Sequence, residues 1–445
     1  MRDVWKTEEL EALDKAHLWH PFTPMRDWCE QDHHPLVLVR GEGAMLEDSE
    51  GRRYLDGNSS IWTNIHGHAH PALNRAIQEQ LDRVAHVSFL GTTNVPAIEL
   101  AAKLSRFFPP DTLSRVFLSD DGSTAIEAAM KMAVQFWQNQ GRPDRSRFVA
   151  FDRAYHGDTL GAANLGGIGA FHKRLAGHEF PVTRISSVVE LDTLPGFHNG
   201  DVAAVVIEPL IQGAAGMRLW PTGMLRELRQ KCDEAGVFLI LDEVMTGFGR
   251  TGKMFACQHE EVVPDFLCLA KGLTGGYLPL AATLTTERVF NAFLGEVAEG
   301  KTFYYGHSYS GNPLGCAAAL ANLEIFEQEK TLETLAPKIQ MLGRMLESLR
   351  DIPFVHEIRQ RGFVAGIEVR NPDGSEFPWP ERTGAKICLA ARKHGLLTRP
   401  ILDTIAFMPP LCTSEAELAD GIRAIRSSIG EVLSGMSEPE CNFKR

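Results

Sequence analysis

The chain lacks the features of a membrane-spanning or exported protein. No apolar run approaches the roughly 20 residues that a spanning helix needs, and the longest are short segments such as 237–241. The first 19 residues carry charge throughout and contain no apolar core of a signal peptide. Eight cysteines are scattered from Cys29 to Cys441 without a CxxC pair. This spacing argues against a disulfide framework or a zinc site, and we expect a cytoplasmic protein with reduced thiols.

Positive charge is also in short supply. The sequence has 57 Asp and Glu against 45 Lys and Arg, a formal net charge of −12. Nucleic acids and anionic membranes bind basic surfaces, so we expect neither as a partner. A length of 445 residues, with 44% hydrophobic and 23% charged residues, is typical of a globular enzyme with one large domain and a smaller one.

Helical periodicity and short apolar runs alternate from about residue 71 onward. Strands that are buried on both faces produce such runs, and their alternation with helices predicts a mostly parallel α/β sheet. The expected helices are 73–84, 97–107 and 123–137, and the expected strands are 115–119, 147–151, 202–207, 237–241 and 265–270.

The two ends of the chain have a different pattern. Segment 40–56 predicts an antiparallel strand pair with a turn at 48–51. After residue 311 the pattern predicts a smaller α+β domain, with strands at 363–369, 397–399 and 404–408 and helices at 383–393 and 414–433. We predict that 1–70 is an N-terminal segment contributing to the small domain, that 71–330 is the large domain, and that 331–445 is the C-terminal small domain.

Chemically suggestive residues follow three of the apolar runs, where ligands collect in open α/β sheets. Asp242 follows 237–241 and could be a metal ligand, a helix cap or the partner of a protonated ring nitrogen. Lys271 follows 265–270, and a lysine there is costly unless its amine is paired or condensed with a carbonyl. Burial lowers the pKa of an amine and makes it a better nucleophile. A lone lysine of this kind more often reaches solvent, but its pairing with Asp242 favours a functional role.

The third position, 119–124, lies between a strand and a helix. Gly122 permits close approach to the backbone, and the first N–H groups of a helix bind phosphate. A simple capping turn is the alternative.

Three other patterns are weaker. Segment 247–254 has the spacing of a P-loop, but Met254 replaces the hydroxyl residue that holds Mg²⁺. Segment 167–172 lacks the third glycine of a dinucleotide-binding motif. The histidines at 66, 68 and 70 have no acid or cysteine nearby, so we expect a polar loop and no metal.

A two-part motif links the strand ends. Asp242-Glu-Val-Met-Thr-Gly-Phe-Gly-Arg250-Thr-Gly is followed, 29 residues after Asp242, by Lys271-Gly. This motif resembles the class III aminotransferases of pyridoxal-phosphate (PLP) fold type I, and the resemblance extends over about 19–410. It implies an α/β fold, with a large domain around a mostly parallel seven-stranded sheet and a smaller α+β domain. It also implies PLP as cofactor and a homodimer with the active site at the subunit interface.

The resemblance also implies roles for individual residues. Lys271 would hold the cofactor and shuttle a proton, Asp242 would keep the pyridine nitrogen protonated, and Val244 and Tyr155 would cover the two ring faces. The catalytic residues implied are thus Lys271, Tyr155 and Asp242. The further cofactor residues implied are Gly122 and Ser123 at the phosphate, Glu208 nearby, and His307 and Ser308 in a loop reaching the partner subunit's phosphate.

Other motifs resemble one branch of the class, the biotin-pathway 7,8-diaminononanoate synthases. They include 18–25, 59–62, 65–67, 130–133, 252–257, 398–400 and 407–410. The branch implies amination of 8-amino-7-oxononanoate (KAPA) to 7,8-diaminononanoate (DAPA). Phe22 and Trp62 would form an apolar tunnel, and Arg399 would bind the terminal carboxylate. The alternative for Trp62 is packing in the core, and the alternative for Arg399 is a surface ion pair. Ile61, Tyr155, Arg250, Lys271 and Gly306 are further candidates for substrate contact.

The sequence leaves the amino donor open between L-lysine and S-adenosylmethionine. Members of the branch that use adenosylmethionine typically have Tyr at the position of Phe22, Trp at that of Ile61 and Pro-Thr at those of His307 and Ser308. These departures remove a phenol and an indole and favour lysine. Two other functions remain as alternatives: an ω-amino acid:pyruvate or ornithine-type aminotransferase, and a non-catalytic PLP-binding protein.

Overall fold

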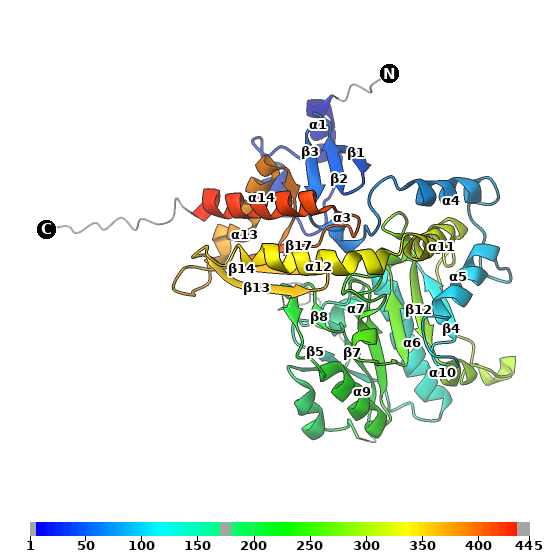
Figure 1. Cartoon of the computed structure of the whole chain (residues 1–445). Coiled ribbons are helices and arrows are strands. Elements are labelled where there is room, and N and C mark those ends of the chain that lie inside the picture. The colour runs from blue at the N-terminus through cyan, green and yellow to red at the C-terminus, as the bar shows by residue number, and fades with distance from the viewer. Residues whose placement is uncertain (1–5, 170–176, 178–179, 199, 434–445) are drawn as a thin grey trace.

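A seven-stranded sheet forms the centre of the larger part of the molecule (Figure 1). The computed structural model describes residues 6–169, 177, 180–198 and 200–433; His172 and Cys441 lie outside these ranges. All strands of the sheet are parallel except β12, which is antiparallel to both of its neighbours. The order across the sheet is β4 (Arg115–Ser119), β12 (Ala281–Thr285), β11 (Phe266–Leu269), β10 (Phe238–Asp242), β7 (Val202–Ile207), β5 (Arg147–Phe151) and β6 (Val182–Ile185).

Helices cover both faces of this sheet because its central strands are apolar on both sides. Every residue of β7, β10, β11 and β12 is buried. Helix α6 (Gly122–Asn139) packs on one face, and α5 (Val95–Ser105) and α9 (Met224–Ala235) pack on the other. The predicted α/β class is confirmed, and the five predicted strands occur within one residue at either end.

A four-stranded antiparallel sheet builds the smaller part. Its order is β13 (Val355–Arg361), β14 (Val364–Val369), β17 (Thr404–Phe407) and β16 (Pro400–Ile401). Helices α13 (Thr383–Ala391) and α14 (Glu415–Leu433) pack against each other beside it. The strand predicted at 397–399 is wrong in its bounds, because the chain bends there and forms two short strands, β15 (Leu396–Leu397) and β16.

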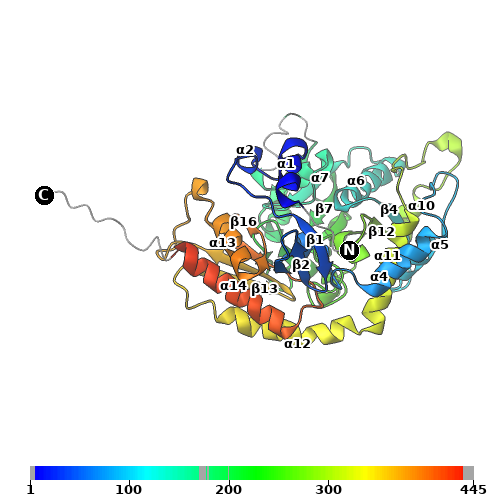
Figure 2. The same cartoon turned by 90° about the horizontal axis from the view of Figure 1, so that it is seen from above.

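The N-terminal strands join this smaller part. β1 (Leu38–Glu42), β2 (Met45–Asp48) and β3 (Arg53–Asp56) form an antiparallel meander, and β15 pairs in parallel with β3. Elements from the two ends of the chain therefore lie side by side (Figure 2). The domain limits at residues 70 and 330 stay a prediction. The remaining elements are α1 (Thr7–His17), α2 (Met25–Trp28), α3 (Ser59–Trp62), α4 (Pro71–Leu81), α7 (Leu160–Leu165), β8 (Ile211–Gln212), β9 (Arg218–Leu219), α10 (Glu287–Asn291), α11 (Pro313–Gln328) and α12 (Thr331–Glu347).

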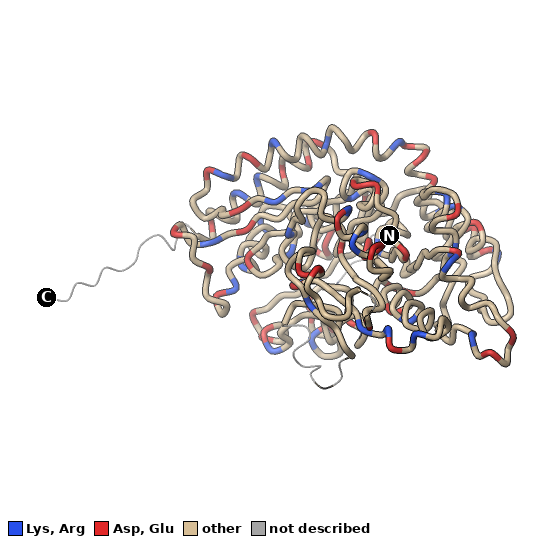
Figure 3. The backbone as a smooth tube through the Cα atoms, turned by 90° about the horizontal axis from the view of Figure 1, so that it is seen from below, with Lys and Arg blue, Asp and Glu red and all other residues tan. Residues whose placement is uncertain are grey.

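Acidic and basic residues are interspersed along the described chain (Figure 3). Among the described residues, no helix combines the length and the apolar character required to cross a bilayer.

Candidate active site

A cavity of about 1850 Å³ lies beyond the carboxyl ends of the parallel strands and extends to the smaller sheet. It is the place where an open α/β sheet gathers ligands. Its wall contains Asp242 of β10, residues from the segments that follow β4, β5, β7 and β11, and residues from β14, β16 and β17. The predicted site residues in this wall are Phe22, Ile61, Trp62, Gly122, Ser123, Tyr155, Glu208, Asp242, Val244, Lys271 and Arg399.

Lys271 follows β11 and carries its amine into the cavity wall. Its Nζ lies 4.8 Å from the centroid of the Trp62 ring. Burial lowers the pKa of Lys271, although the charges of Asp242 and Glu208 act in the opposite direction. The amine is therefore more easily deprotonated than in water, which a nucleophile or a proton acceptor requires.

Asp242 ends β10 and forms a buried pair with His156. Asp242 Oδ2 lies 2.7 Å from His156 Nδ1, and Asp242 Oδ1 accepts the backbone hydrogen of Val244 at 3.1 Å. Burial alone lowers the pKa of His156, but the hydrogen bond and charge of Asp242 outweigh it and the pKa is raised. His156 thus fixes the orientation of the Asp242 carboxylate in the wall of the cavity. No feature of the sequence pointed to a role for His156, although it directly follows Tyr155.

Glu208, after β7, is a second buried carboxyl in the wall. Its oxygens accept the backbone hydrogens of Tyr155 at 3.2 Å and Gly213 at 3.0 Å. Burial raises the pKa of Glu208 to about 7, with the charge of His156 opposing. The Tyr155 hydroxyl donates to Asp158 Oδ2 at 2.5 Å, so Glu208 and Asp158 together hold Tyr155 from its backbone and from its ring.

The N-terminus of α6 faces the cavity through Gly122 and Ser123. Asp121 caps the helix by accepting the backbone hydrogen of Thr124 at 2.9 Å. A Cβ on Gly122 would lie 2.6 Å from Val244 Cγ1, so only glycine fits. The backbone N–H groups of a first helical turn have no helical partner and bind anions. This end of the cavity has the geometry of a phosphate cradle.

Trp62 is carried by a turn of unusual handedness. Ser59, Ser60, Ile61 and Trp62 have φ values of 46°, 49°, 67° and 67°, which makes α3 one left-handed turn closed by a bond from the Trp62 backbone N–H to the Asn58 carbonyl at 2.8 Å. Left-handed backbone costs roughly 1–2 kcal/mol per non-glycine residue and persists only where neighbours hold it. The indole packs near Gly213 and Met245 in a small apolar cluster.

Comparison with known proteins identifies the family. The family model for aminotransferase class-III matches residues 29–429. The chain belongs to the class III aminotransferases. It is 47% identical to the adenosylmethionine-8-amino-7-oxononanoate aminotransferase of Nitratidesulfovibrio vulgaris, over 95% of this chain and 82% of that protein. It is 45% identical to the protein of the same name from Geobacter sulfurreducens, over 97% and 99%.

Solved structures of such enzymes resemble this aminotransferase closely. The adenosylmethionine-8-amino-7-oxononanoate aminotransferase of Methanocaldococcus jannaschii superposes with a TM-score of 0.92 at 41% identity, covering 96% of this chain and 99% of that one. An (S)-enantioselective omega-transaminase from Thermomicrobium roseum gives a TM-score of 0.91 at 34% identity, with coverage of 97% and 100%.

Enzymes of class III use PLP, and the cavity of this aminotransferase fits that cofactor. The α6 terminus offers backbone donors to a phosphate, the buried Asp242 offers an anion to a ring nitrogen, and Lys271 offers an amine. Val244 and Tyr155 line the space between them. The space at Gly122 is so narrow that a single Cβ would fill it. This space and the buried carboxylate fit a planar ring that carries a phosphate group.

Four predicted site residues of the aminotransferase lie outside the cavity wall. Arg250 is fully buried, and its guanidinium donates to the carbonyls of Pro409 at 2.7 Å and Asn64 at 2.5 Å. Gly306 and Ser308 are exposed, whereas His307 Nδ1 lies 3.0 Å from Asp120 Oδ2. Within one chain, then, Arg250 joins two loops, and segment 306–308 lies on the surface beside the α6 terminus.

Arg399 differs from the other arginines of the smaller part that line the cavity. Arg359, Arg370 and Arg382 form ion pairs with neighbouring carboxylates. Arg399 is exposed in the wall and has no ion pair among the described residues. It is therefore available for an incoming anion.

The three predicted loop histidines have separate partners. His66 is buried against Phe326, His68 Nε2 contacts Asp56, and the His70 side chain caps α4. Within the described part of the chain, no group of three or more His, Cys, Asp or Glu side chains could hold a metal ion.

Proposed function

We propose that this aminotransferase converts KAPA to DAPA. The observation that carries the proposal is the near full-length identity, 41–47%, to proteins named as aminotransferases of 8-amino-7-oxononanoate. The wall of the cavity supports it, because aromatic residues and Arg399, which has no ion pair among the described residues, suit a substrate with an aliphatic chain and a terminal carboxylate.

Lys271 is the proposed catalytic base. PLP, when bound, supplies an electron sink that stabilises the negative charge left on the substrate carbon. Lys271 Nζ would hold the cofactor, then take the proton from the carbon that bears the amino group and return one in the second half-reaction. The lowered pKa of the Lys271 amine, caused by burial, suits this task.

Asp242 and His156 would hold the ring nitrogen in its protonated form. The Asp242 carboxylate is 5% exposed, so its charge is poorly screened by water. His156 orients that carboxylate through the 2.7 Å contact. Gly122 and Ser123 would bind the phosphate, while Val244 and Tyr155 would cover the ring.

The apolar chain of KAPA would lie along Trp62, Ile61 and Phe22, with its carboxylate on Arg399. A guanidinium can bind a carboxylate through two parallel hydrogen bonds, which fixes the length of the substrate as well as its charge. Glu208 would stay close to the reacting end and influence the charge there.

The proposed amino donor is S-adenosylmethionine, which the relatives carry in their names. Lysine, which Phe22, Ile61 and His307 favour, is the alternative. Both donors carry an amino group on a carbon with a removable hydrogen, so the same Lys271 serves either one.

We also propose a homodimer. Trp19, Leu90, Val297 and Tyr304 are all at least 86% exposed, and a subunit interface would bury such apolar side chains. Leu90 neighbours Phe89, which packs on Gly311 at the end of the 306–311 loop. A second chain covering this surface would bring Gly306, His307 and Ser308 toward its cavity.

Turnover with defined substrates tests the proposal. The holoenzyme is incubated with KAPA and either S-adenosylmethionine or lysine, and DAPA is measured by mass spectrometry, with a Lys271→Ala control. DAPA formation with one donor supports the assignment and names the donor. Amination of pyruvate or 2-oxoglutarate, without any DAPA, would instead assign an omega-transaminase activity, which the 34% identical structural relative carries in its name.

A further inference from the structure

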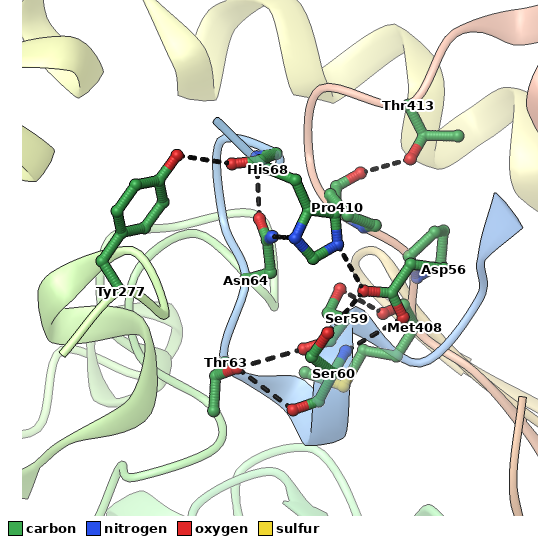
Figure 4. Close-up of polar contacts among 12 residues, drawn as sticks. Asp56, Ser59, Ser60, Thr63, Asn64, His68, Tyr277, Met408, Pro410 and Thr413 are labelled. Atoms are coloured by element: carbon green, nitrogen blue, oxygen red, sulfur yellow. Dashed lines mark hydrogen bonds and ion pairs between the residues drawn. The ribbon is translucent and has the colours of Figure 1, made fainter. Parts of the chain in front are cut away.

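A buried polar cluster surrounds the left-handed turn that carries Trp62 (Figure 4). Its centre is Asp56, the last residue of β3, which is only 1% exposed. A charge so deeply buried persists only if donors surround it. The hydrogen bonds that it accepts show which part of the turn the carboxylate stabilises.

Both carboxylate oxygens of Asp56 accept hydrogen bonds from Ser60, in the middle of the turn. Its Oδ1 accepts the backbone hydrogen of Ser60 at 2.9 Å, and its Oδ2 accepts the Ser60 hydroxyl hydrogen at 2.8 Å. Ser60 is the second of the four residues with positive φ. The carboxylate thus clamps the residue whose backbone would otherwise return to a right-handed conformation.

His68 completes the shell of Asp56, and Asn64 fixes which nitrogen of His68 carries hydrogen. Asn64 Oδ1 accepts the backbone hydrogen of Gly67 at 2.8 Å, so its Nδ2 points at His68 Nδ1, 3.1 Å away. His68 Nδ1 is then an acceptor, and Nε2 donates to Asp56 Oδ2 at 2.9 Å. The histidine is held as the neutral tautomer that suits the carboxylate.

The start of the turn is also bonded to the segment that follows β17. The Ser59 hydroxyl donates to the Met408 carbonyl at 2.7 Å, and the Trp62 indole N–H donates to Asn58 Oδ1 at 2.9 Å. The indole is therefore rigid relative to the turn. Its place in the cavity depends on whether the turn keeps its handedness.

We propose that Asp56 is a positioning residue for substrate: through Ser60 it holds the left-handed turn that sets Trp62 as a wall of the binding cavity. This inference rests on the proposed function, because KAPA is the substrate whose chain would lie on Trp62. It adds that the specificity of this wall is set by a carboxylate that does not line the cavity.

The test compares Asp56→Asn with Asp48→Asn. Asp48 is a matched control, since it is 2% exposed, ends the neighbouring strand β2 and accepts bonds from Tyr54 and Arg52 outside the cavity. With Asp56→Asn we expect the KM and Kd for KAPA to rise about tenfold while kcat changes less than about twofold, because binding common to ground and transition states is lost. Asp48→Asn should lower the melting temperature and leave both constants unchanged.

A double-mutant cycle separates positioning from general destabilisation. If Asp56 acts through Trp62, Asp56→Asn adds no further rise in the Kd for KAPA, measured by calorimetry, to a Trp62→Ala chain. If Asp56→Asn does not fold, Ser60→Ala removes one contact at an exposed position, and we expect a rise of about threefold in the same Kd. Equal rises for the Asp56 and Asp48 variants, or a full Asp56→Asn effect in the Trp62→Ala chain, would overturn the proposal.

Failure of the inference is distinct from failure of the proposed function. A wild-type enzyme that makes DAPA, with a Trp62→Ala variant of unchanged affinity for KAPA, contradicts the positioning role alone. A wild-type enzyme that makes no DAPA contradicts the function. The cycle is then run on the amine that is converted, where the same coupling between Asp56 and Trp62 is expected.

Discussion

At the scale of single residues, Lys271 should be indispensable for turnover. It is the lysine in the cavity wall, and its burial lowers its pKa. Lys271→Ala should reduce turnover by at least about a thousandfold, since loss of a positioned base alone costs 10²–10⁴. Circular dichroism and gel filtration should show an unchanged fold, and near-normal rates in this variant would contradict the assignment.

Glu208 should make stability depend on pH. Because burial raises the pKa of this carboxyl to about 7, the folded chain holds the proton more tightly than the unfolded chain does. Its contribution is complete below about pH 4.5 and is lost as the pH rises through 7, a change of about 3 kcal/mol. The melting temperature of the holoenzyme should therefore fall more steeply between pH 5 and 8 in the wild type than in Glu208→Gln.

Glu260→Gln controls for the loss of an acceptor oxygen. Glu260 is also buried and accepts two backbone hydrogens, from Gly223 and Arg226, but it does not line the cavity. Parallel melting curves for Glu208→Gln and the wild type across this pH range would show that Glu208 does not titrate as expected.

The residues that the sequence revealed are those whose chemistry conflicts with their surroundings. Lys271 and Asp242 stand out because charged groups follow apolar strands. His156 gave no such signal, since its partner Asp242 lies 86 residues away in the sequence. Asp56 gave none either, because nothing in the sequence shows that it is buried. A polar residue in a loop does not show from sequence that it will be buried.

At the scale of elements, the start of α6 should be sensitive to a single methyl group. A Cβ on Gly122 would lie 2.6 Å from Val244 Cγ1. We expect Gly122→Ala to weaken PLP binding at least about tenfold, which equals about 1.4 kcal/mol, as measured by titrating the apoenzyme with PLP.

Gly315 in α11 supplies the control for that substitution. Its Cβ would make an ordinary contact of 3.4 Å with Leu280. Gly315→Ala should therefore retain normal PLP affinity. Equal affinities for PLP in the Gly122 and Gly315 variants would show that the N-terminus of α6 does not bind the phosphate.

The strands that could be predicted from the sequence are those whose residues are buried along nearly their whole length. The apolar strands β5, β7, β10 and β11 follow from composition because both of their faces are covered. β6 and β12 were not predicted. β6 is an edge strand with half-buried polar residues, and β12 begins with two alanines, a residue type that is depleted in strands. The left-handed turn at 59–62 was equally hidden, because neither serine nor isoleucine favours positive φ.

At the scale of the whole molecule, the exposed apolar surface predicts a dimer. Gel filtration with light scattering should give twice the 49.2 kDa of one chain. Leu90 is 93% exposed and follows Phe89, which packs on Gly311. A charge at this position of the proposed interface should shift the enzyme toward monomer, so Leu90→Asp should also reduce activity. Val189→Asp, at a residue 64% exposed on a different element, is the control and should stay dimeric. A fully active monomer would contradict the shared site.

The central claim is that the cavity accepts KAPA and releases DAPA, and a single half-reaction tests it most directly. Purified yellow holoenzyme is mixed with DAPA alone, and the absorbance band of its cofactor is followed, with Lys271→Ala as the blank. We predict that DAPA bleaches the band and that KAPA appears in the mixture in equal amount. A band that DAPA leaves unchanged, while another amine bleaches it, would contradict the substrate assignment and leave only the class III aminotransferase.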